Sequence, residues 1–177
     1  MLTRKEMEAV MKKEIQIEAE VTANDMFRFL LYHNYCRFSG LLSIVFSCAC
    51  FILAIVTLGE VKITGTVALL VIGGLFSFYQ PFALYQKAKK QVRKNASLRE
   101  RLTYVFDEDK ITIKLQDTEA VLGWDDVTKV VGLRKNILIY NGPVRANVIP
   151  RKGIEEEARQ ILELARSKKS PYFVKGR

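Results

Sequence analysis

The sequence predicts a membrane-embedded α-helical hairpin together with a small α+β domain on one side of the membrane. Three observations lead to this fold class. Residues 38–59 and 63–86 contain no charged side chain. Six short strand-like segments separated by turn signals follow between residues 101 and 150, and residues 154–165 have the apolar spacing of an amphipathic helix. A chain of 177 residues has room for one small domain beside such a hairpin.

Each uncharged run is long enough to cross a membrane, because about 20 apolar residues in a helix span a hydrocarbon core of about 30 Å. The first run lies behind a charged, periodic segment and is longer than the apolar region of a signal peptide, which predicts a retained helix. Only Glu60–Lys62 separates the runs after Gly59, so a tight hairpin is expected. Neither run contains an ionisable residue, which argues against an ion or proton path.

The distribution of Lys and Arg predicts the orientation of this hairpin. Lys62 is the one such residue between the two runs, whereas Arg4, Lys5, Lys12, Lys13, Arg28 and Arg37 precede them and Lys87, Lys89, Lys90, Arg93, Lys94, Arg99 and Arg101 follow. Positive residues concentrate on the cytoplasmic side of membrane proteins. We therefore expect a multi-pass protein of the cell membrane with both termini in the cytoplasm.

The net charge of +9 is consistent with binding to nucleic acid or to an anionic membrane surface. The positive residues crowd directly beside the second apolar run, which favours lipid and argues against nucleic acid. Each such residue contributes about 1 kcal/mol of attraction near an anionic bilayer. The candidate headgroup contacts are Lys87, Lys89, Lys90, Arg93, Lys94, Arg151 and Lys152.

The soluble part divides around the hairpin. Residues 14–21 alternate apolar and polar side chains as a half-buried strand does, and the later strands are the sheet available to it. We expect 1–37 to hold this strand and a juxtamembrane helix capped by Thr22 and Asp25. The remaining parts are the hairpin at 38–86, a basic segment at 87–100, a domain of antiparallel strands closed by a helix at 101–170 and a tail at 171–177.

Small residues recur every three to four positions within both apolar runs. They include Ser39, Ser43, Ser47, Cys50 and Ala54 in the first run and Gly65, Gly73 and Ser77 in the second. Such stripes allow helices to approach closely in lipid. Packing of the hairpin on itself and contact between two copies in a homodimer would use the same pattern, so both remain open.

The stretch "VLGWDDVTKVVG" at residues 121–132 holds the only tryptophan, beside two aspartates. Catalysis would need a nucleophile with a base, or a metal cluster. The only histidine, His33, precedes the first apolar run, and residues 101–170 contain no cysteine. We therefore expect Trp124 to be a structural anchor in the core and the aspartates to be solvated turn residues. No catalytic, cofactor or metal site is expected.

Several short motifs resemble the YcxB-like family of small bacterial membrane proteins. They are an early strand with "T-x-x-D", the two-helix hairpin, "YVFDEDKI", "WDDVTKV", "ILIY" and "VIPRKGI", in that order between residues 14 and 168. The resemblance implies a bacterial inner-membrane protein whose cytoplasmic domain is pleckstrin-homology-like, either a small sheet or a partial barrel. It implies no catalytic residues.

The expected function is that of a non-enzymatic membrane anchor that presents its cytoplasmic domain to a protein partner. Exposed strand edges and the groove beside the last helix are the general docking places of such folds. The alternatives are a module that senses anionic lipid and an accessory subunit of a transport or immunity system.

Overall fold

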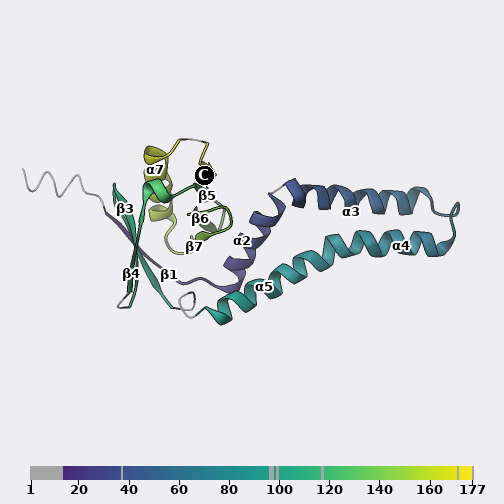
Figure 1. Ribbon diagram of the computed structural model, residues 1–177, viewed down its shortest axis with the longest axis horizontal. Helices are drawn as coiled ribbons and strands as arrows, with labels where there is room; N and C mark the ends of the chain where they lie inside the picture. Colours follow the sequence, from purple (N-terminus) through teal and green to yellow (C-terminus); the bar gives the residue numbers. More distant parts are fainter. Residues whose placement is uncertain are drawn as a thin grey trace, which may run out of the picture. The chain divides into compact units, whose positions relative to one another are not determined.

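The computed structural model describes residues 14–36, 38–95, 98, 100–116, 118–170 and 172–176. The chain divides into two compact units (Figure 1). Residues up to Asp25 and from Val92 onward form an α+β unit, and Met26–Gln91 form a helical unit. In the sequence, the helical unit is therefore an insertion between the first strand and the remaining strands of the α+β unit.

Helices that follow one another closely form the helical unit: α2 (Ala23–Tyr35), α3 (Phe38–Val56), α4 (Ile63–Gly74), the π-helical turn η1 (Leu75–Tyr79) and α5 (Gln80–Lys94). Helices α3 and α4 run side by side in opposite directions (Figure 1). The widened turn η1 comes just before Pro81, which has no N–H to donate to the preceding helical turn. Helix α2 packs on α5 through Phe27 and Tyr85, whose ring centroids are 5.3 Å apart.

Helix α2 begins at the cap that the sequence predicts. The Thr22 backbone N–H donates to Asp25 Oδ2 at 3.1 Å, and the Asp25 N–H donates to Thr22 Oγ1 at 3.3 Å. The two side chains thus satisfy each other's backbone N–H groups, as in a capping box, and the negative charge lies in the first turn, where the helix dipole favours it.

The first sheet of the α+β unit is an antiparallel meander of β1 (Ile15–Ala19), β2 (Leu102–Phe106), β3 (Lys110–Leu115) and β4 (Thr118–Gly123), in that order. Strand β1 pairs with β2 in a register that places Ile17 opposite Tyr104. Its alternate residues are buried, as the alternation of residues 14–21 predicts. The early strand therefore joins the sheet formed by the later part of the chain.

The second sheet has the order β7 (Ala146–Pro150), β6 (Asn136–Tyr140), β5 (Lys129–Gly132) and β8 (Val174–Gly176). The sequence predicted a single small antiparallel sheet or a partial barrel, whereas the described residues form two sheets, and β8 runs parallel to β5. The one-turn 3₁₀ helix η2 (Trp124–Asp126) separates β4 from β5 and moves the chain to the second sheet. Strand β8 lies in the segment expected to be a tail.

Helix α7 (Glu155–Lys168) closes the core with the apolar stripe that the sequence predicts. Its buried residues are Ala158, Ile161, Leu162 and Ala165. Trp124 belongs to the same core, with 5% of its surface exposed, and its indole N–H donates to the carbonyl oxygen of Asp107 at 2.9 Å. Trp124 is therefore buried in this core, and its one polar atom is satisfied.

Candidate membrane interface

The helical hairpin exposes most of its large apolar side chains. In α3 these are Leu41, Leu42, Ile44, Val45, Phe46, Ile52, Leu53, Ile55 and Val56, and from α4 into η1 they are Ile63, Val67, Leu70, Val71, Ile72, Leu75, Phe76 and Phe78. Soluble monomers seldom expose contiguous apolar patches larger than a few hundred Å². The hairpin surface is thus the candidate functional site of the chain.

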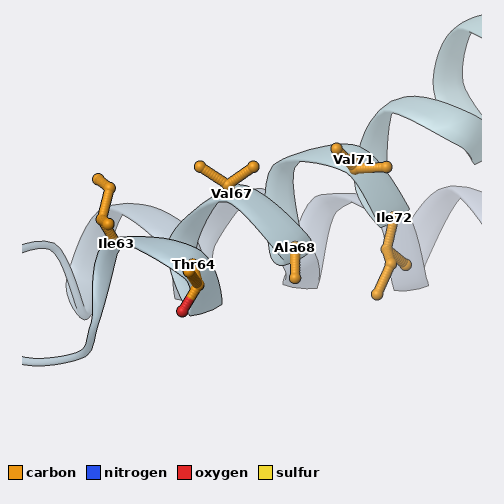
Figure 2. A pocket seen from close by; sticks show the side chains of 6 residues that line it. All are labelled: Ile63, Thr64, Val67, Ala68, Val71 and Ile72. Atoms are coloured by element: carbon orange, nitrogen blue, oxygen red, sulfur yellow. The ribbon is translucent and has the colours of Figure 1, made fainter.

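One face of α4 shows how this surface is built. Ile63, Thr64, Val67, Ala68, Val71 and Ile72 line a shallow groove along the helix (Figure 2). All six side chains come from this one helix, and the Thr64 hydroxyl is their only polar group. The groove therefore offers apolar contact without the convergent polar groups that orient a small polar ligand.

Between α3 and α4 the hairpin buries small and polar residues instead. Ser47 Oγ donates to the Gly73 carbonyl at 2.7 Å and lies 2.5 Å from Ser77 Oγ. A Cβ at Gly73 would lie 3.2 Å from the Phe51 ring and 3.3 Å from the Cys50 Cβ, so glycine allows this close approach. The small-residue stripe thus packs the hairpin on itself. A homodimer through the same residues would have to replace this contact.

By length and composition, the continuous helix Ile63–Lys94 could cross a membrane. Only 6% of its apolar window is buried, whereas an apolar core helix of a soluble protein is mostly buried. The described apolar part of the first run, Gly40–Val56, meets the same criterion only if it is counted with Ala23–Tyr35 as one span. One helix therefore qualifies by itself, where the sequence predicted two.

Five of the seven predicted headgroup contacts lie on α5. Lys87, Lys89, Lys90, Arg93 and Lys94 are all exposed, and no ion pair joins them to any residue that the structure describes. Lys87, Lys90 and Lys94 follow one another at helical spacing and share one stripe. Ala88, between them in the sequence, is fully buried. Helix α5 thus has a basic, solvated face and an apolar face.

Arg151 and Lys152, the other two predicted contacts, follow β7 in the α+β unit. The Arg151 guanidinium donates to the Leu133 carbonyl at 3.1 Å, and the Arg151 backbone N–H donates to the Lys135 carbonyl at 2.9 Å. Arg151 is half-buried and holds the connection between β5 and β6, while Lys152 is exposed. Arg151 therefore has a structural role that the sequence did not suggest.

A buried polar pair was also not predicted from the sequence. Asn136 Nδ2, at the start of β6, donates to Asp25 Oδ1 at 3.1 Å, and both side chains are buried. The sequence indicated only a helix cap at Asp25. No local pattern signals a contact between residues so far apart in the chain. The pair ties the start of α2 to the second sheet.

The carboxylates beside Trp124 lie at the surface. Asp125 and Asp126 are both exposed in η2. Across the described ranges of the chain, no three His, Cys, Asp or Glu side chains are grouped so that they could hold a metal ion.

The model of the family described as YcxB-like protein matches residues 106–165. These residues, which we call the YcxB-like segment, are similar to that family. The YcxB-like segment runs from the end of β2 into the last turn of α7 and contains Trp124 and the polar residue Asn136. The resemblance noted for residues 14–168 is thus confirmed for this segment. No curated protein and no solved structure matches the chain.

Proposed function

We propose that this chain is a non-enzymatic membrane anchor that presents a small YcxB-like domain for protein interaction or regulation. The observation that carries the proposal is the outward-facing apolar surface of α3 and α4 around a seam of small residues. Hydrocarbon satisfies such a surface, and the hydroxyl groups are satisfied inside the hairpin. In this proposal α3 and the helix from Ile63 both span the membrane, and the groove on α4 faces lipid tails.

Extraction from membranes tests this anchor. After expression in bacterial cells, the chain should remain in the membrane pellet in alkaline carbonate and be released by detergent. A variant in which residues 38–86 are replaced by a flexible Gly/Ser linker should appear in the supernatant. Release of the unaltered chain by carbonate alone would contradict the membrane proposal.

The orientation follows from the positive residues of α5. Their concentration after the second helix supports a hairpin with both termini in the cytoplasm of the cell, at the inner membrane. In a chain without native cysteines, a cysteine at Glu60 should react with a membrane-impermeant thiol reagent in intact cells, and one at Glu119 should react only after lysis. The opposite labelling pattern would exclude this orientation.

The order of elements in the α+β unit supports a pleckstrin-homology-like domain. Four antiparallel strands are followed by three more in a second sheet and then by the closing helix α7. Such modules commonly dock other molecules, which is consistent with an interaction role. Crosslinking in native membranes, followed by purification of the chain, would reveal the partner.

Binding of anionic lipid is the second candidate function, and the exposed basic face of α5 favours it. Changing Lys89, Lys90, Arg93 and Lys94 to Gln should weaken binding of the reconstituted chain to soluble anionic headgroup analogues, and more strongly at low salt. Changing Lys168, Lys169 and Lys175 to Gln removes positive charge elsewhere and serves as the control. Equal binding by both variants would exclude lipid sensing by α5.

A further inference from the structure

The segment after α7 occupies the edge of the second sheet. Strand β8 pairs in parallel with β5, with Val174 opposite Val130 and Gly176 opposite Gly132. The Val130 N–H donates to the Phe173 carbonyl at 2.7 Å. Helix α7 contacts both strands, so β8 lies along β5 and beside this helix. We call this place the β5 edge.

Three interactions at the β5 edge define which sequence fits it. The Val174 side chain is buried in the core cluster, whereas Lys175 is exposed. Gly176 has a φ of 95°, and a Cβ there would lie 2.0 Å from the Gly132 carbonyl oxygen. The Arg166 guanidinium donates to the Gly176 carbonyl at 2.6 Å. The β5 edge therefore fits a three-residue segment in which the first residue is apolar, the second can be any residue and the third is glycine.

Strand β8 is the shortest and least buried of the described strands in its sheet. It has three residues and buries one of them, whereas all five residues of β6 are buried. The adjoining Tyr172 and Phe173 are exposed. Segments with few buried contacts open locally at low free-energy cost. An open sheet edge is in turn a general site for adding a peptide strand.

We propose that the β5 edge is a peptide-binding site for an extended partner segment of the form apolar-x-Gly, and that β8 is an internal competitor for it. Backbone hydrogen bonds would supply affinity, while the pocket of Val174, the close contact at Gly132 and Arg166 would supply specificity. This inference deepens the interaction role in the proposed function. It does not depend on insertion of the hairpin into a membrane.

A labelled peptide with the sequence of residues 170–177 serves as the probe. The chain in lipid nanodiscs is compared with a variant that lacks residues 170–177, and binding is measured by fluorescence anisotropy. The variant should bind about tenfold more tightly or better, because a tethered competitor acts at a local concentration on the order of millimolar. A peptide with the change Gly176→Val should not bind, and one with Tyr172→Ala should bind as the original does. Lack of binding by a folded deletion variant, or equal binding of all three peptides, would overturn the proposal.

A second measurement covers the case in which the deletion variant does not fold. Arg166→Ala keeps β8 and the core but removes the bond to the Gly176 carbonyl, and should speed hydrogen exchange of the Val130 amide. The proposal would be overturned if the Val130 amide exchanged as slowly as the β6 amides, if Arg166→Ala left this rate unchanged, and if no peptide bound. Carbonate extraction of each variant distinguishes the membrane-anchor proposal from the peptide-site proposal. If the anchor proposal is wrong, carbonate releases the chain, whereas an error in the peptide-site proposal leaves extraction unchanged.

Discussion

The α+β unit and the hairpin of α3 and α4 differ in the side chains that they bury. The first buries large apolar residues such as Phe106, Ile137 and Ile161, none of which is exposed to any measurable extent. The hairpin buries Ser47, Cys50, Ala54 and Thr66, whereas most of its leucine, isoleucine and phenylalanine side chains are exposed. In water, burial of large apolar surface drives folding at about 25 cal/mol per Å². The α+β unit follows this rule, and the hairpin does not.

This difference is the basis of the proposed membrane anchor. Where the outer medium is hydrocarbon, large apolar side chains gain nothing by facing inward, and small residues with satisfied hydroxyl groups pack helices together instead. The proposal therefore assigns water to the α+β unit and lipid to the hairpin. The following predictions test each side of it, from the largest expected effect to the smallest.

Trp124→Ala tests the apolar core of the α+β unit. Because the ring is almost fully buried and its N–H is bonded to Asp107, we expect a loss of about 3–5 kcal/mol in the free energy of unfolding. The exposed neighbour is the control, and Asp125→Asn should change stability by less than about 0.5 kcal/mol. Denaturant titration followed by circular dichroism measures both. A larger effect of Asp125→Asn would revive a functional site at this turn.

A matched pair of valines tests the medium around each unit. Val71 on α4 is 56% exposed, and Val144 between β6 and β7 is 57% exposed. In hydrocarbon, Val71→Lys should cost about 2.5–3.5 kcal/mol of apparent insertion free energy. In water, Val144→Lys should change stability by less than about 0.5 kcal/mol. Insertion is measured with reconstituted translocon, and unfolding by denaturant. Similar small costs at both sites would remove the contrast between the units.

Asp25→Ala tests the polar pair within the otherwise apolar interior of the α+β unit. The substitution removes the acceptor of the buried Asn136 amide and also the helix cap, and should cost about 1–3 kcal/mol of unfolding free energy. Asn24→Ala, at the exposed neighbouring residue, is the control and should change stability by less than about 0.5 kcal/mol. Equal thermal unfolding curves for the two variants would show that the pair adds nothing to stability.

Alkaline pH provides a test that changes no residue. Burial raises the pKa of Tyr104 from 10.0 to about 12. Above pH 10 the phenol therefore ionises in the unfolded chain while it stays protonated in the folded one. The unfolding free energy should fall by about 1 kcal/mol between pH 10 and 11 through this group. Tyr104→Phe should lack this part of the loss, and Tyr172→Phe, at an exposed site, should retain it. The same pH dependence in both variants would contradict the assignment.

The smallest effect is expected at the seam of the hairpin. Ser47→Ala removes the bonds to Gly73 and Ser77 and should cost about 0.6 kcal/mol, as polar contacts between membrane helices do on average. Cys48→Ala, at an exposed position of the same helix, should have no measurable effect. Unfolding in mixed micelles measures the difference. A larger cost at Cys48 would place the packed face elsewhere on α3.

Patterns within short windows were read correctly from the sequence. Alternation identified β1, β2 and β3, turn signals around short segments identified β4 to β7, the apolar stripe identified α7, and the cap at Thr22 identified the start of α2. Each of these signals depends on residues within a few positions of one another, so local side-chain period and propensity suffice. The exposure of the hairpin also follows from composition, since an uncharged run of this length has no polar face.

Tertiary structure alone decided which of these elements meet. The division into two sheets, the parallel pairing of β8 with β5, the internal bonds of Arg151 and the contact of Asp25 with Asn136 all join residues distant in sequence. A polarity period shows which face of an element is buried but not which element covers it, because the same face can pack against any apolar partner. The sequence thus determined most of the elements and their buried faces, and packing decided which elements meet.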